Sequence, residues 1–125
     1  MFKISGNLTA DSVKRFTAAG KPVLGFTVAV NNGKDKEGKD KPPTYVDCSV
    51  WGENRVTQTE GLLKKGISVD LTGEGDVEVY KAKDESYRGK ITLNVSFGDV
   101  VTFNGKGNPP TKTALFTKAA EPAAA

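Results

Sequence analysis

Residues 44–51 read TYVDCSVW, and this stretch decides the fold because its alternating side chains form two sets of opposite character. Side chains in a strand alternate between its two faces. One face carries Cys48 between two valines, an apolar set suited to a core. The other face carries two aromatic rings, Tyr45 and Trp51, together with polar side chains. The pattern therefore predicts a strand that packs one face into a hydrophobic interior and turns the other outward.

The outward face of this strand is the first candidate for function. Tyr45 and Trp51 share it with Asp47 and Ser49, and aromatic rings beside such polar groups fit poorly inside a barrel. Either the rings pack under a loop or against a subunit, or they bind a flat ligand. Nucleobases are flat, and stacking one on an aromatic ring contributes about 1–3 kcal/mol with little sequence preference. Tyr80 repeats the pattern on a later strand, where the alternative is a ring that covers its neighbours at a hairpin tip.

Strand patterns dominate the rest of the chain. Apolar residues alternating with polar ones predict strands over residues 2–9, 23–30, 67–81, 91–97 and 100–103. The strand over 67–81 is interrupted by two glycines, which often mark a bulge or a sharp bend in a barrel. The long polar stretch before residue 44 is rich in turn formers and mixed charges, and it predicts a solvated loop.

One helix is predicted, over residues 53–65, between the third and fourth strand runs. Asn54 is a candidate N-cap, and the sequence Lys64-Lys65-Gly66 is typical of a helix C-terminus. Threonines and Gly61 make the segment a weak helix former that depends on tertiary packing. The order of elements predicts an all-β protein, a five-stranded Greek-key barrel of the oligonucleotide-binding type with one short helix between strands 3 and 4.

The length of 125 residues is typical of one domain. We expect this domain to span residues 1–104. Residues 105–125 are rich in proline and alanine, and we expect them to form a flexible C-terminal tail.

Composition argues against several classes of function. The chain has no histidine, which removes the most common general base and zinc ligand, and its single cysteine, Cys48, lies on the apolar face of its strand. We therefore expect no catalytic residue, no metal site and no cofactor, and we expect the protein not to be an enzyme. No segment has the apolar character of a signal peptide or a membrane span, so a cytoplasmic protein without membrane contact is expected.

The net charge of +3 is only mildly basic, so bulk charge alone does not indicate a nucleic-acid partner. Lysines and arginines occur singly, and each one alone is most often a solvated surface charge. Together with exposed rings, they are suited to follow a phosphate backbone. The candidate backbone contacts are Lys3, Lys14, Arg15, Arg55, Lys65, Lys81 and Arg88.

Four stretches, in order and spacing, resemble the single-stranded DNA-binding proteins of bacteria and phages. They are GNL at 6–8 followed by Asp11 and VKRF at 13–16, GKPV at 20–23 with FTVA at 26–29, YVDCSVWG at 45–52, and LKKGISV at 63–69. The resemblance covers roughly residues 2 to 103.

The resemblance implies an oligonucleotide-binding fold that binds single-stranded DNA without strong sequence preference during replication, recombination or repair. It also implies a homo-oligomer, either a tetramer or a dimer. Trp51, Tyr45 and Tyr80 stand at positions where the family has base-stacking aromatic residues, and Arg15 and Lys65 stand at basic positions. The three rings are the same ones that strand alternation places on polar faces.

Two departures from the family pattern affect these expectations. Residues 76–79 read DVEV where the family is usually rich in arginine and lysine, and the chain ends in EPAAA without an acidic tail. We therefore expect a phage, plasmid or accessory member that does not recruit partners through such a tail. The alternative function is a protein-interaction module of a replication or primosome complex, with the rings packed against partners and only weak DNA binding.

Overall fold

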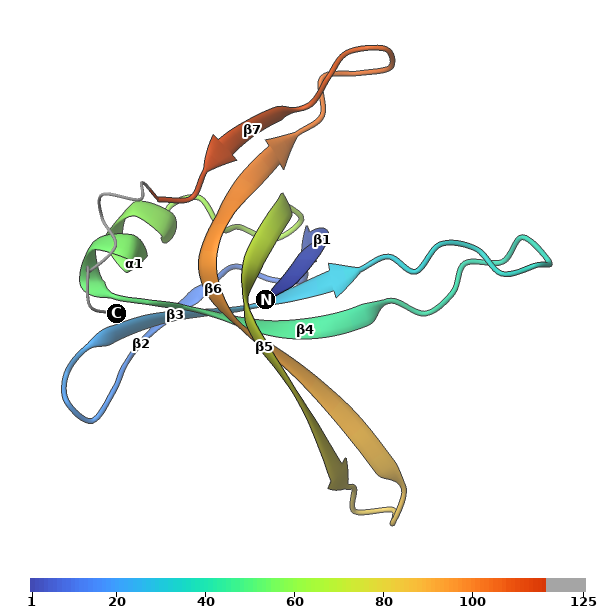
Figure 1. The fold of residues 1–125 in the computed structure, drawn as a ribbon, viewed down its shortest axis with the longest axis horizontal. Helices are drawn as coiled ribbons and strands as arrows, with labels where there is room; N and C mark the ends of the chain where they lie inside the picture. Colours follow the sequence, from blue (N-terminus) through green and yellow to red (C-terminus); the bar gives the residue numbers. More distant parts are fainter. Residues whose placement is uncertain (117–125) are drawn as a thin grey trace.

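The computed structural model describes residues 1–116, and nearly all of their regular structure is β-strand (Figure 1). Within this range no helix is long and apolar enough to cross a bilayer. The elements in chain order are β1 (Phe2–Leu8), β2 (Val13–Phe16), β3 (Pro22–Val30), β4 (Thr44–Trp51), α1 (Glu53–Thr59), β5 (Ser68–Lys81), β6 (Tyr87–Thr102) and β7 (Thr111–Ala114).

Five of the strands close into a barrel. They are hydrogen-bonded in the order β1-β5-β6-β4-β3, and β1 also pairs with β3, which closes the ring. The β4–β6 pair is parallel and the other pairs are antiparallel. The helix α1 lies between the third and fourth barrel strands of the chain. This confirms the predicted five-stranded barrel, to which β2 adds a hairpin strand on β3 and β7 adds a strand on β6.

The core is the inward face of these strands, as alternation predicts. Cys48 and its two flanking valines are buried, together with Leu24, Phe26 and Val28 of β3. Burying a side chain of this size contributes about 1.5–3 kcal/mol. The core residues of the barrel strands are Leu8, Leu24, Phe26, Val28, Val46, Cys48, Val50, Val69, Leu71, Leu93 and Val95.

Strands β5 and β6 are much longer than the others, and their far ends leave the barrel as a two-stranded arm, residues 76–90 (Figure 1). Near the barrel, Gly73 lies so close to the Asn94 carbonyl that a side chain would collide with it. The register shifts beside this glycine: Thr72 pairs with Phe97 and Gly73 with Val95, which leaves Ser96 as a bulge residue. The bulge turns Phe97 outward, although unbroken alternation through residues 91–97 places it beside Val95.

The helix is shorter than predicted. α1 ends at Thr59, whereas the sequence pattern extends it to Lys65. The predicted cap is also wrong, because the N-cap is Gly52, which adopts a positive φ of 101° and has no side chain to donate or accept. Leu63 is nevertheless fully buried beyond the end of the helix. The weak helix propensity of the threonines and Gly61 explains why helical hydrogen bonding stops at Thr59, although Leu63 still packs in the core.

The expectation of a flexible tail from residue 105 is wrong for residues 111–116. β7 pairs with β6, and Leu115 and Phe116 after it are buried. The Leu115 N–H donates to the Gly98 carbonyl (2.9 Å), and its carbonyl accepts from the Thr59 hydroxyl (3.3 Å). Burial of the Leu115 and Phe116 side chains against α1 stabilises the ordered conformation of this segment. The remainder of the predicted tail, residues 117–125, lies outside the described residues.

An ion pair also ties β7 to the barrel. Asp70 of β5 accepts a hydrogen bond from the Ser5 hydroxyl (2.6 Å), and its second oxygen lies 3.0 Å from the Lys112 ammonium. The hydrogen bond from Ser5 is the main cause that holds the pKa of Asp70 below its ordinary value, with further help from Lys112, while burial opposes the shift.

We therefore expect Asp70 to make folding more favourable at neutral pH than in acid. Because its pKa is lowered by folding, its contribution is present above the pKa of the unfolded chain and is lost as pH falls through the lower folded-state pKa. Urea unfolding followed across the acid range should show this loss in the wild type and a weaker one in Asp70→Asn. Ser5→Ala should lose part of the same dependence. If the free energy of unfolding changes with pH equally in the wild type and in Asp70→Asn, Asp70 is not the group responsible.

Candidate nucleic-acid interface

The outward faces of β3 and β4, with the adjoining part of β6, form one continuous wall. Tyr45 and Trp51 stand on it with 58% and 48% of their surface exposed. Asp47 and Ser49 lie between them on β4 and pair in register with Thr92 and Asn94 of β6. We call this surface the outer wall. The rings are thus turned away from the barrel interior, as the strand pattern predicts.

Trp51 is held in place at one end of the outer wall. Its indole N–H donates to the side-chain oxygen of Asn94 on β6 (3.0 Å). Two grooves border it. The first, with a volume of about 470 Å³, is lined by Arg15, Gly25 and Ser49 among others, and we call it the Arg15 groove. The second, of about 610 Å³, lies between the β2–β3 hairpin and the start of α1, and we call it the Lys14 groove.

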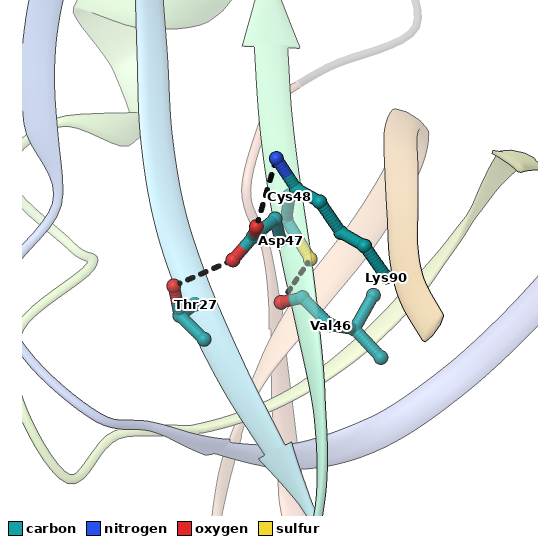
Figure 2. Close-up of polar contacts among 5 residues, drawn as sticks. All are labelled: Thr27, Val46, Asp47, Cys48 and Lys90. Atoms are coloured by element: carbon teal, nitrogen blue, oxygen red, sulfur yellow. Dashed lines mark hydrogen bonds and ion pairs between the residues drawn. The ribbon is translucent and has the colours of Figure 1, made fainter. Parts of the chain in front are cut away.

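Asp47 occupies the middle of the outer wall and lines the Arg15 groove. Figure 2 shows how its carboxylate is held from two sides. One oxygen accepts a hydrogen bond from the Thr27 hydroxyl of β3 (3.0 Å), and the other lies 3.6 Å from the Lys90 ammonium of β6. The carboxylate therefore has a defined orientation on an otherwise open surface.

Cys48 points the other way, into the core. Burial raises the pKa of its thiol to about 12, and the nearby Asp47 charge adds to the effect. A thiol with such a pKa is almost entirely protonated at neutral pH and is a poor nucleophile. The expectation that Cys48 is a buried core residue is confirmed.

Two predicted basic residues of β2 lie beside Trp51. Arg15 lines the first groove, on the side of β2 that faces the outer wall. Lys14 lines the second groove, where its ammonium lies 3.4 Å from a Glu60 carboxylate oxygen and 5.8 Å from the centre of the Phe16 ring. The structure therefore brings Trp51, Arg15 and Lys14 together, with Tyr45 further along the same wall.

Of the other basic candidates, Arg55 also lines the Lys14 groove, whereas Lys3 and Lys65 line neither groove beside Trp51. Lys3 on β1 lines a separate apolar groove of about 340 Å³. Arg55 is only 8% exposed, and its guanidinium lies 5.0 Å from the centre of the Phe116 ring, so it packs against the C-terminal segment. Burial lowers the pKa of Arg55. Lys65 is exposed in the turn after α1, where its backbone N–H donates to Asp11 (2.8 Å).

Tyr80, Lys81 and Arg88 lie on the arm. Tyr80 is exposed and pairs in register with Arg88, and Lys81 pairs with Tyr87. Three acids of β5 lie beside the outer wall, because their partners on β6 pair with β4 or directly precede the residues that do. These acids are Glu74, Asp76 and Glu78, opposite Asn94, Thr92 and Lys90. A strand of nucleic acid that runs from Trp51 to Tyr80 would pass beside them.

Two further residues of the site are missing from the sequence prediction. Phe16 is exposed and lines the Lys14 groove together with Trp51. Asn94 orients the indole of Trp51. The end of the VKRF motif draws attention to Phe16. Nothing in the sequence pairs Asn94 with Trp51, because they lie 43 positions apart and come together only through the parallel pairing of β4 with β6.

Comparison with curated proteins finds bacterial relatives with related sequences. The single-stranded DNA-binding protein of Chlamydia muridarum is 33% identical over 105 residues, which cover 84% of this chain and 62% of that protein. The single-stranded DNA-binding protein of Mycobacterium leprae is 31% identical over 96 residues, covering 74% of this chain and 56% of that protein. The chain thus spans about three-fifths of the length of these relatives. A phage or plasmid origin stays a prediction.

Solved structures show the same fold. The small single-stranded DNA-binding protein from Streptomyces coelicolor superposes with a TM-score of 0.62 at 21% identity, covering 78% of this chain and 89% of that one. A Plasmodium falciparum SSB in complex with single-stranded DNA superposes with a TM-score of 0.58 at 18% identity, covering 79% of this chain and 90% of that one. These likenesses confirm the oligonucleotide-binding fold.

A family model provides the link between fold and sequence. The model described as "Single-strand binding protein family" matches residues 1–102, which include all five barrel strands, α1 and the outer wall. The chain therefore belongs to the single-strand binding protein family.

Proposed function

We propose that this protein binds single-stranded DNA without strong sequence preference and protects it during replication, recombination or repair in the cytoplasm. Bases stack on Trp51, Tyr45 and Tyr80, while lysines and arginines neutralise phosphates. No catalytic step is part of this function. The observation that carries the proposal is the exposed Trp51 ring, held by Asn94 between two open grooves.

The arrangement favours unpaired bases for physical reasons. An indole fixed by a hydrogen bond presents a rigid flat surface, and every base has a π-face that stacks on it. Arg15 and Lys14 line the two grooves that border the ring, so each offers a positive charge to phosphates next to a stacked base. A duplex keeps its bases stacked on one another, so it offers no such face to Trp51.

Titration with oligo-dT tests the proposal directly. Because Trp51 is the only tryptophan, its fluorescence reports on the site alone, and we expect quenching on binding. Affinity should fall as salt rises, with a slope of log K against log salt of about −0.7 for each phosphate neutralised. A duplex of the same length is the control and should bind far more weakly. Unchanged fluorescence together with no gel shift would reject the proposal.

Self-association is part of the proposal, and we favour a dimer or a tetramer. The arm and β1 expose apolar side chains on a surface separate from Trp51, namely Phe2, Val77, Val79 and Tyr87. Single exposed apolar residues are common, but a group of four beside an apolar groove is typical of an interface. Additional sites on one DNA strand would raise avidity. Light scattering should show a mass above that of the monomer.

The alternative function, a protein-interaction module with weak DNA binding, predicts a different result. If Tyr80 and Trp51 pack against partners, replacing both with alanine disrupts the assembly. If they stack on bases, the double variant keeps its oligomeric mass and loses DNA binding. The exposure of Trp51 beside Arg15 favours the second outcome.

A further inference from the structure

A carboxylate in the middle of a wall proposed to bind a polyanion requires an explanation. The side chain of Asp47 is 51% exposed and lines the Arg15 groove. It lies two residues from Tyr45 and four from Trp51 on the same face of β4. Successive residues on one face of a strand are about 7 Å apart. A base stacked on Tyr45 therefore lies within reach of Asp47, whereas Ser49 lies between Asp47 and Trp51.

The carboxylate is oriented and still has acceptor capacity. Thr27 donates to one oxygen and Lys90 approaches the other, from the strands on either side (Figure 2). An ionised carboxylate accepts about four hydrogen bonds, so positions remain on both oxygens. The groove contains a second carboxylate, Asp11, but its Oδ1 accepts the Lys65 backbone N–H in a turn. Asp47 is thus the carboxylate held on the strand that carries both rings.

Stabilisation by the ion pair with Lys90 does not explain why a carboxylate is present at position 47. Lys90 and Asp47 are each about half exposed, and ion pairs between exposed side chains contribute little to stability. The nearby charge of Asp47 also repels phosphates. Base edges therefore meet this part of the wall more favourably than the backbone does.

We propose that Asp47 reads the edge of a stacked base and favours bases with an exocyclic amino group, cytosine above all, over thymine. A carboxylate accepts a hydrogen bond from the N4 amino group of cytosine. Thymine presents the O4 carbonyl oxygen at the position of that amino group, and this oxygen repels a carboxylate. The inference rests on the proposed binding of single-stranded DNA and adds a modest base preference at one position of the site.

The test compares oligo-dC and oligo-dT of equal length, by Trp51 fluorescence and by gel shift. Asp47→Asn is isosteric and keeps an oxygen for Thr27, so folding should be unchanged. We expect the ratio of dC affinity to dT affinity to fall by about 2- to 10-fold in this variant, the effect of losing one hydrogen bond. Thr27→Val, which frees the carboxylate to rotate, should lower the ratio by a smaller factor.

Asp76→Asn is the matched control. Asp76 and Asp47 both pair in register with Thr92, from opposite sides, and Asp76 does not line the groove. Removing its charge should strengthen binding of both oligonucleotides equally and leave their ratio unchanged. If Asp47→Asn also changes both affinities by one common factor, Asp47 acts only through charge and the inference is wrong. If neither oligonucleotide binds the wild type, the proposed function itself fails.

Discussion

Replacing Trp51 with alanine is expected to weaken oligo-dT binding by about 5- to 150-fold. Loss of one base–ring stack costs about 1–3 kcal/mol, which corresponds to this range. The indole is exposed, lies between the two grooves and donates its N–H to Asn94, so the change removes a fixed stacking surface and leaves the core intact. Because the variant lacks tryptophan, binding must be measured by gel shift or with a labelled oligonucleotide.

Phe103→Ala is the control for Trp51→Ala. Phe103 is also an exposed aromatic residue, but it lies with residues of β1 and β5, away from the outer wall. Its removal should leave oligo-dT affinity unchanged. Equal losses in the two variants would mean that exposed rings act non-specifically, and no loss in Trp51→Ala would remove the basis of the stacking mechanism.

The second large effect concerns the C-terminal segment. Leu115→Ala is expected to lower the free energy of unfolding by about 2–5 kcal/mol, the range for truncating a fully buried leucine. Leu115 is 1% exposed and belongs to the same core cluster as the barrel residues, although it lies beyond the residues matched by the family model. A flexible tail at this position would give a change within about 0.5 kcal/mol.

Urea unfolding followed by circular dichroism measures the effect of Leu115→Ala. Thr113→Ala is the comparison, because Thr113 lies exposed on β7 and its replacement should cost no more than about 1 kcal/mol. Oligo-dT affinity of the folded Leu115→Ala protein should match the wild type, since Leu115 lines neither groove beside Trp51. A stability change no larger than that of Thr113→Ala would show that the segment 111–116 is not an integral part of the fold.

Local alternation predicts much of this molecule. The two faces of residues 44–51 behave as expected, with Cys48 in the core and both rings outside. The barrel and the position of its helix follow from the order of the strand patterns. Period-two alternation is reliable here because one face of each strand is buried, which penalises a shift of register by a single residue.

Features that depend on distant partners are not visible in the sequence. Arg55 has the appearance of a surface cation, yet it packs on Phe116, a residue of the expected tail. The segment 111–116 is short and follows two prolines, so its composition gives no indication of the apolar surface on α1 that it covers. The same applies to Asp47, whose orientation depends on hydroxyl and ammonium groups from two other strands.

The bulge at Ser96 has a consequence for insertions and deletions in this strand. Residues before it and after it face the core with opposite parity, so the core-facing positions of β6 follow odd numbers up to Val95 and even numbers from Gly98. Deletion of Ser96 would give an uninterrupted ladder in which all remaining side chains of β6 stay on their present face of the sheet. Deletion of Leu93 would instead turn Asn94 toward the core and Val95 outward, because the alternation is restored only at the bulge. Length variation within the barrel part of this strand is therefore expected at the bulge.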